Sequence, residues 1–287
     1  MLRSGQKASS TLSFVSSLQR RSRQFQEVVD GCRFLLRNAK GADKARRYLD
    51  FRIPQHLQDE FGFGYFPTDG EELSQLLEVV DRQTLEDLNF LYPRHVAGGV
   101  IDHGHFAEHN LIMPFRDAHG NIAALLGRSL LTDSERDKLN LQKYKYSLGC
   151  YKGLYVFGLD KARDSIIQND CVIGVEGQFD YIACRAEGLH NVVAFGGTNV
   201  SRYQMFLLHR YTNNIILMFD NDEAGHKAKK RTRKRFGSKV SVKTAAPPGH
   251  YKDIDEFLRK ERNLAWRKQV VDGLKELARQ PKEINGS

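Results

Sequence analysis

The stretch that decides the fold is residues 215–225, with the sequence IILMFDNDEAG. A run of apolar residues leads here directly into Asp220, Asp222 and Glu223. Such a run indicates a buried strand, and this one ends in a group of carboxylates. The chain of 287 residues carries a formal net charge of +9 at pH 7, so acid gathered at one point needs a specific cause.

Short apolar runs alternate with helical patterns on both sides of this stretch. The apolar runs predict strands within residues 171–177, 191–195, 214–220 and 239–244. The segments between them have the spacing of amphipathic helices, at residues 179–189, 201–211 and 223–236. Strands that alternate with helices of about ten residues predict a parallel α/β sheet flanked by helices.

The upstream part of the chain has a different pattern. Residues 26–90 show mainly helical periodicity, and residues 110–130 predict two strands joined by a turn at residues 117–120. Pro114 predicts an edge position or a bulge for the first of these strands. Residues 1–25 carry Lys and Arg but no acid, which predicts a basic flexible arm, with an organellar transit peptide as the lesser alternative.

Acidic residues follow several of the predicted strands. Because parallel strands end at the same edge of a sheet, these acids are expected to converge there: Glu176, Asp180, Asp220, Asp222, Asp253 and Asp255. Crowded carboxylates repel one another, and Mg²⁺ or Mn²⁺ relieves that repulsion by taking oxygen ligands. The alternative is structural, because Asp222, Asp253 or Asp255 could cap the helix that follows it.

Positive charge is concentrated in the predicted helix that follows Asp222. Between His226 and Lys243 the chain has nine Lys or Arg residues and no acid. Such a run favours an anionic partner, most commonly nucleic acid, and the alternative is a solvated helix face. The candidate nucleic-acid contacts are Lys227, Lys229, Lys230, Arg231, Arg233 and Lys234.

The cysteines and the hydropathy exclude other classes. Cys32, Cys150, Cys171 and Cys184 lie far apart and form no Cys-x-x-Cys pair, so we expect no zinc, no disulfide framework and a reducing compartment. No window approaches the roughly 18 apolar residues of a membrane span, so no membrane partner is expected.

Three of these segments resemble the Toprim domain, which DnaG-type bacterial and phage primases share with topoisomerases and some nucleases. They are VIGVEGQFD, VVAFGGTNV and ILMFDNDEAGHKA. The Toprim pattern has a Glu after one strand and Asp-x-Asp after the next but one, matched here by Glu176 and by Asp220 with Asp222. The later segment KDIDEFL is similar to the primase segment KDPDEFL, with Ile254 in place of proline.

The upstream half resembles the primase branch of the Toprim families. The segment ARRYLDFRIPQHLQDEFGFGYFP is similar to the opening of the primase core, and LIMPFRDAHGNIAALLGRSL places Arg128 at a family arginine. The segment KYKYSLGCYKGLYVFGLDKAR matches Lys143 and Lys152 to family lysines. The resemblance departs at residues 107–110, AEHN, where primases usually carry arginines.

The resemblance implies an α/β fold in which a Toprim-type parallel sheet flanked by helices follows an N-terminal mixed α+β primase subdomain. The expected division is the basic arm at 1–25, the primase-core subdomain at 26–165, the Toprim catalytic domain at 166–260 and a helical tail at 261–287. No zinc-binding module or helicase-binding domain is recognised, so a replicative helicase is expected to act in trans.

The implied activity is metal-dependent synthesis of short RNA primers on a single-stranded DNA template by nucleotidyl transfer. Glu176, Asp220 and Asp222 would be catalytic, and all six acids would hold two or more Mg²⁺ or Mn²⁺ ions. Arg128, Lys143 and Lys152 would bind the phosphates of NTPs or of the template. The expected location is the cytoplasm of a bacterium or of a phage-infected host. A Toprim nuclease and a non-catalytic nucleic-acid-binding protein remain as alternatives.

Overall fold

The computed structural model describes residues 3–68 and 70–279, with side chains for residue 17 and from residue 19 onward. The chain divides into two compact units. Unit 1 reaches Phe115 and continues over Asn121–Cys150, while unit 2 takes Arg116–Gly120 and the chain from Tyr151 onward. The boundary therefore lies before the expected position at residue 165, because the segment from Tyr151 onward folds with the second unit.

The helices of unit 1 are led by one long helix, α1 (Arg3–Asn38). Its buried side chains confirm the predicted periodicity: Phe25, Val28, Val29, Cys32 and Leu35. The helix is continuous from Arg3, although the sequence predicted an arm over residues 1–25. The shorter helices are η1 (Lys40–Ala42), α2 (Asp43–Arg52), α3 (Gln55–Phe61), α4 (Gly70–Leu77), α5 (Arg82–Asp87) and α6 (Asp133–Lys138).

Unit 1 also contains a four-stranded sheet of order β1-β4-β5-β6. The strands are β1 (Gly64–Tyr65), β4 (Leu111–Arg116), β5 (Ile122–Arg128) and β6 (Tyr144–Tyr146). The predicted strand pair on either side of residues 117–120 is present as β4 and β5. The sheet order places β4 inside the sheet rather than at its edge. Proline is tolerated there because the pairing of β4 with β1 stops at Ile112, so the N–H group that Pro114 lacks is not needed for a hydrogen bond to β1.

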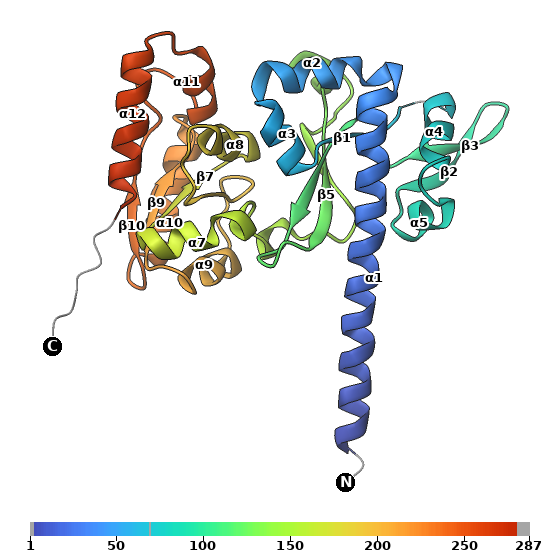
Figure 1. Ribbon diagram of the computed structural model, residues 1–287, viewed down its shortest axis with the longest axis horizontal. Coiled ribbons are helices and arrows are strands. Elements are labelled where there is room, and N and C mark those ends of the chain that lie inside the picture. Colours follow the sequence, from blue (N-terminus) through green and yellow to red (C-terminus); the bar gives the residue numbers. More distant parts are fainter. Residues whose placement is uncertain (1–2, 69, 280–287) are drawn as a thin grey trace. The chain divides into compact units, whose positions relative to one another are not determined.

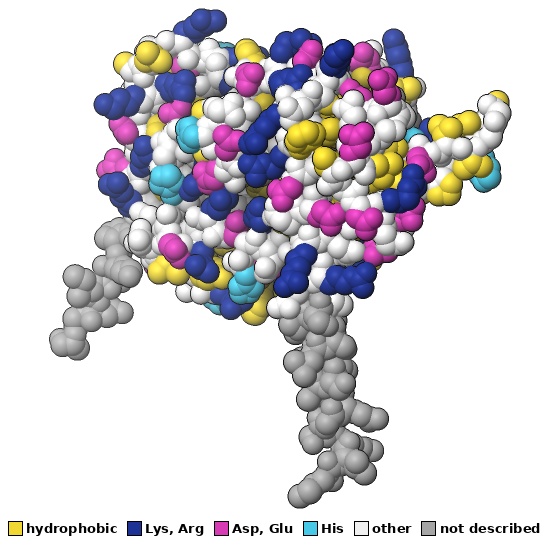
Figure 2. All heavy atoms as spheres, turned by 45° about the vertical axis from the view of Figure 1, so that its right-hand side comes forward, with side chains coloured by type: hydrophobic (Ala, Val, Ile, Leu, Met, Phe, Trp, Pro, Cys, Tyr) yellow, Lys and Arg dark blue, Asp and Glu magenta, His cyan; other side chains and the backbone are white. Residues whose placement is uncertain are grey.

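A separate hairpin of unit 1 joins β2 (Leu91–Val96) to β3 (Gly99–Gly104). Figure 2 shows it projecting at the right with hydrophobic side chains on its surface, and Val100 and Ile101 are about half exposed. At its base Arg82 of α5 forms an ion pair with Asp102. None of the described helices is both long and apolar enough to cross a membrane.

Unit 2 is built on the predicted parallel sheet, whose strand order is β10-β9-β7-β8. Figure 1 labels β7, β9 and β10 of this sheet. The strands are β7 (Val172–Val175), β8 (Val192–Ala194), β9 (Asn214–Met218) and β10 (Ser241–Thr244). All three pairings between neighbours are parallel. The two inner strands, β7 and β9, are almost wholly buried, as their unbroken apolar sequences require.

The helices of unit 2 alternate with these strands. They are η2 (Lys152–Leu154), α7 (Leu159–Asn169), α8 (Gln178–Ala186), α9 (Arg202–His209), α10 (Glu223–Phe236), α11 (Ile254–Lys260) and α12 (Leu264–Leu277). The expected helical tail is present as α12, and Val271 and Leu274 anchor it. Because every strand is parallel, the loops after β7, β8, β9 and β10 leave the sheet at one edge, where the predicted site residues follow them.

Candidate active site

Glu176 directly follows β7, and hydrogen bonds to its backbone carbonyl fix its position. Its carbonyl oxygen accepts hydrogen bonds from the N–H groups of Gly196 and Gly197, at 2.9 and 3.1 Å, in the loop after β8. Its side-chain oxygen Oε2 is buried, and no hydrogen bond reaches that oxygen from the described part of the chain. Burial, together with the charges of Asp220 and Asp222, raises the pKa of Glu176 to about 7.

Asp220 and Asp222 follow β9, as predicted. Asp222 caps α10, because its Oδ1 accepts the N–H of Gly225 at 2.8 Å. A Cβ atom at Gly225 would lie 2.2 Å from the carbonyl oxygen of Asp220, so only glycine allows this tight turn into the helix. Burial and the charge of Asp253 raise the pKa of Asp220 above its ordinary value, while Lys252 opposes the shift.

Asp180 lies in the first turn of α8 and is almost completely buried. It accepts the N–H of Gly177 at 3.1 Å and the N–H of Asp255 at 3.3 Å, which ties α8 to α11. Burial and the charges of Asp253, Asp220 and Asp255 raise its pKa well above its ordinary value. These interactions place Asp180 in the same electrostatic cluster as the predicted site acids.

The two acids of the third pair, Asp253 and Asp255, have different structural roles. Asp253 caps α11 by accepting the N–H of Glu256 at 2.6 Å. Asp255 is buried and forms an ion pair with Arg259, 3.1 Å away on the next turn of α11. Asp222 and Asp253 therefore do cap helices, as the structural alternative predicted. Each cap uses only Oδ1 of the carboxylate, so Oδ2 is not part of the cap.

Lys252 is a site residue that the sequence analysis missed. Its Nζ lies 3.5 Å from Oδ2 of Asp220, and its carbonyl accepts the N–H of Asn221 at 2.6 Å. Burial acts to lower its pKa, but Asp220 and Asp222 outweigh burial and raise it. Its position immediately before Asp253 was the one available signal, and a single exposed lysine in a loop carries too little pattern to be recognised.

The acid cluster fits a divalent cation by charge and by donor type. The negative charges of its members raise one another's pKa. Oε2 of Glu176 lies in this negative field without a hydrogen-bond partner among the described residues. Carboxylate oxygens are the ligands that Mg²⁺ and Mn²⁺ prefer. Among the described residues no three His, Cys, Asp or Glu side chains form a ready-made coordination shell, so the cluster offers charge and donors rather than a closed cage.

The predicted phosphate-binding cations lie in different units. Lys152, at the start of η2 in unit 2, donates to the carbonyl of Gly196 at 3.1 Å, in the same loop that holds Glu176. Arg128 and Lys143 belong to unit 1. The Arg128 guanidinium is buried between the rings of Tyr48 and Tyr144, 5.0 and 5.2 Å from their centroids. Lys143 is exposed, with its Nζ 5.9 Å from the Tyr144 ring centroid.

The basic run after Asp222 forms α10, as predicted, but its cations differ in environment. Lys227 pairs with Glu223, and Arg231 donates to the carbonyl of Thr198 at 2.7 Å. Lys229 is buried. The remaining predicted contacts, Lys230, Arg233 and Lys234, line a pocket between α10 and the end of β10.

Comparison with known proteins agrees with this arrangement. The family described as Toprim-like matches residues 173–258, which include both Asp220 and Asp222. Residues 173–258 therefore form a Toprim-like domain. The DNA primase of Synechococcus elongatus is 32% identical over 278 residues, which cover 92% of this chain and 38% of that protein.

Two solved primase structures have a fold similar to that of this chain. The zinc-binding and RNA polymerase domains of Aquifex aeolicus primase match with a TM-score of 0.70 and 26% identity, covering 88% of this chain and 60% of that chain. A DnaG primase catalytic domain bound to ssDNA matches with a TM-score of 0.66 and 24% identity, covering 88% of this chain and 82% of that chain. The chain spans less than half the length of the curated primases that it matches.

Proposed function

We propose that this chain is the catalytic core of a DNA primase, which makes short RNA primers on single-stranded DNA. The observation that carries the proposal is the buried Oε2 of Glu176, which has no hydrogen-bond partner among the described residues and lies near the charges of Asp220 and Asp222. It supports the proposal because the chain is similar to DNA primases over most of its length. In the reaction a ribonucleotide 3′-hydroxyl attacks the α-phosphate of an incoming NTP, and pyrophosphate leaves.

Bound Mg²⁺ or Mn²⁺ ions, two or more, would supply charge stabilisation to the attacking and leaving oxygens. Glu176, Asp220 and Asp222 would hold these ions. Asp180 and Asp253 would complete the negative field, and Asp255 would fix α11 through Arg259. Cation binding would keep Glu176 ionised at neutral pH, because a nearby positive charge lowers the pKa of a carboxyl.

The basic residues would bind the substrates. Lys152, held against the loop that positions Glu176, would neutralise a phosphate bound near the acid cluster. Arg128 and Lys143 would contact the NTP or the template from unit 1, and α10 would contact nucleic-acid phosphates. A primase catalytic domain of the same fold has been seen bound to ssDNA, which supports the single-stranded template. We further propose a bacterial or phage-infected cytoplasm and a replicative helicase acting in trans.

One reaction tests the proposal against nuclease activity. The purified chain is incubated with end-labelled single-stranded DNA, α-labelled NTPs and Mg²⁺ or Mn²⁺, and the products are separated on a denaturing gel. We expect short RNA products whose formation requires the template, together with intact DNA. Shortened DNA without RNA would favour the Toprim nuclease, and binding without either product would favour a non-catalytic protein.

A further inference from the structure

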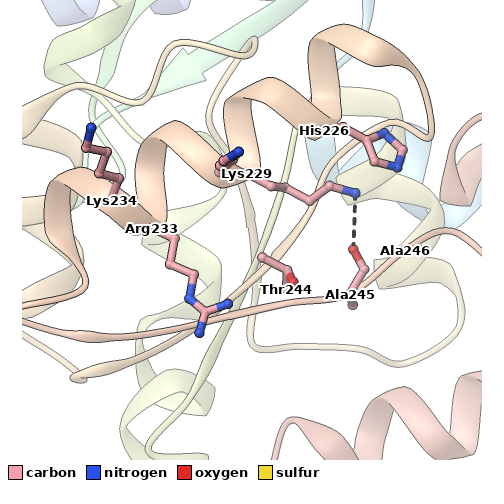
Figure 3. Close-up of a pocket in the computed structure, with 8 residues that line it drawn as sticks. His226, Lys229, Arg233, Lys234, Thr244, Ala245 and Ala246 are labelled. Carbon is pink, nitrogen blue, oxygen red and sulfur yellow. Dashed lines mark hydrogen bonds between the residues drawn. The ribbon is translucent and has the colours of Figure 1, made fainter.

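A basic pocket lies beside the acidic edge, between α10 and the end of β10. Its volume is about 790 Å³. Figure 3 shows side chains from α10 around it, with Thr244, Ala245 and Ala246 on the opposite wall. The lining residues from α10 are His226, Lys229, Lys230, Arg233 and Lys234, so the α10 side of the pocket contains no carboxylate. A pocket of this size is large enough for a nucleotide-sized ligand.

The buried cation of this pocket is Lys229, which is only 7% exposed. Its Nζ donates to the carbonyl of Phe219 at 3.4 Å. It also donates to the carbonyl of Ala245 at 3.5 Å (Figure 3). Both contacts are long, and both acceptors are neutral carbonyls. An ammonium group has three donors, and burying one without an anion in contact is costly. Burial lowers the pKa of Lys229, and the more distant charges of Asp220 and Asp222 oppose that shift.

Three exposed cations stand above this buried one. Arg233 and Lys234 follow Lys230 by three and four residues, a spacing that makes both of them neighbours of Lys230 on the helix surface, within about 6 Å along its axis. Like charges at this spacing destabilise a helix, and a bound anion removes the penalty. On the other face of α10, Lys227 forms an ion pair with Glu223 and Arg231 donates to the carbonyl of Thr198, so these two cations already have partners within the chain.

The pocket and the acid cluster share one edge of the sheet. Ala245 follows β10 and donates its N–H to the carbonyl of Leu217 in β9, the strand that ends two residues before Asp220. Lys229 connects the two regions, because its ammonium lines the pocket and also contacts the carbonyl of Phe219, the residue before Asp220. A phosphate bound in the pocket would therefore lie close to the predicted site of phosphoryl chemistry.

We propose that the pocket lined by Lys229, Lys230, Arg233 and Lys234 is a phosphate-binding site that holds one end of the nucleotide or strand served by the acidic edge. The proposal rests on the proposed function for the identity of its ligand. It limits the predicted phosphate contacts of the basic run to the residues of α10 that line the pocket. In this proposal Lys229 is a buried hydrogen-bond donor at the base of the pocket.

The test compares two triple variants that each remove three positive charges from α10. The pocket variant is Lys230→Gln/Arg233→Gln/Lys234→Gln, and the matched control on the other face is Lys227→Gln/Arg231→Gln/Arg235→Gln. Binding of a fluorescent 12-nucleotide single strand is measured by anisotropy in EDTA over a series of salt concentrations. Circular dichroism of each variant verifies that the helix content of the whole protein is unchanged.

We expect the pocket variant to flatten the slope of log K against log salt by about two, since each phosphate contact on a single strand contributes about 0.7. The control variant should change that slope by less than half as much. A further variant, Lys229→Met, should weaken binding although it changes no exposed residue. An equal loss of strand affinity and of salt dependence in the two triple variants would overturn the proposal. It would indicate that the basic run acts only as diffuse surface charge.

A second arm distinguishes the source of the phosphate, with ATP in EDTA as the probe. Loss confined to the strand would assign the site to a nucleic-acid phosphate, and loss confined to ATP would assign it to the triphosphate. No loss with either probe would overturn the proposal. Because these assays need no catalysis, failure of primer synthesis would count against the proposed function alone, while pocket-specific loss of binding would still support the site.

Discussion

Replacing Glu176 by Gln is expected to stabilise the metal-free protein above pH 7. The folded-state pKa of Glu176 is about 7, against an ordinary value of 4.5. The folded protein therefore binds more protons than the unfolded chain between these values. Its stability falls as pH rises through that window and is then level, because ionised Glu176 is unfavourable in the fold. Gln at this position removes the titration and keeps the shape.

The size of the effect follows from the shift. The difference between the two pKa values corresponds to at most about 3 kcal/mol. Glu176 is only partly buried, so solvent screening reduces the expected gain to about 1–2 kcal/mol at pH 8. At pH 5 most of this gain should be absent, since Glu176 is then protonated in the folded state.

Urea unfolding in EDTA measures this difference. The single tryptophan, Trp266, packs on Phe257 in unit 2, with the ring centroids 5.1 Å apart, so its fluorescence reports on the unit that contains Glu176. Adding Mg²⁺ at pH 8 should stabilise the wild type more than the Glu176→Gln variant, because a cation favours the ionised carboxyl. A gain of equal size at pH 5 and pH 8, or a loss at pH 8, would refute the electrostatic reasoning.

Further variants probe the supporting contacts. Gly225→Ala forces a Cβ atom against the carbonyl of Asp220 and should cost about 2 kcal/mol in urea unfolding, together with loss of synthesis; wild-type stability would contradict the tight turn. Asp253→Ala should lose about 1 kcal/mol of helix capping, whereas Asp253→Asn, which can still cap, should be at least as stable as wild type at pH 8. Arg259→Met should destabilise by about 3 kcal/mol because it leaves buried Asp255 without its ion pair, and an unchanged midpoint would remove Arg259 from that role.

The fold of unit 2 could be predicted from the sequence because its strands are short apolar runs that are easily recognised. The inner strands β7 and β9 are apolar on both faces, and each is followed within two residues by a Glu or Asp that cannot continue a buried strand. The convergence of Glu176 and Asp220 followed from parallel topology alone. The start of α1 was missed, because residues 1–25 carry too few apolar positions to indicate the helix that continues through them.

Other parts of the site depend on tertiary contacts that a sequence pattern does not contain. Lys252 pairs with Asp220 across two loops, and Lys229 differs from its neighbours in α10 only by the direction in which it faces. The position of Arg128 was predicted through a family motif, but its place between Tyr48 and Tyr144 required residues about 16 and 80 positions away to meet. Helix capping and metal binding use the same Asp residues at the same positions, so the sequence could not separate them at Asp222.

The most direct measurement is template-dependent RNA synthesis by the wild type and by the Asp220→Asn variant, with labelled NTPs, single-stranded DNA and Mg²⁺ or Mn²⁺. Wild-type protein should give short RNA products that vanish in EDTA, and Asp220→Asn should give none while its thermal stability stays level or rises. Synthesis at the wild-type rate by a folded Asp220→Asn variant would contradict a catalytic site at this edge of the sheet.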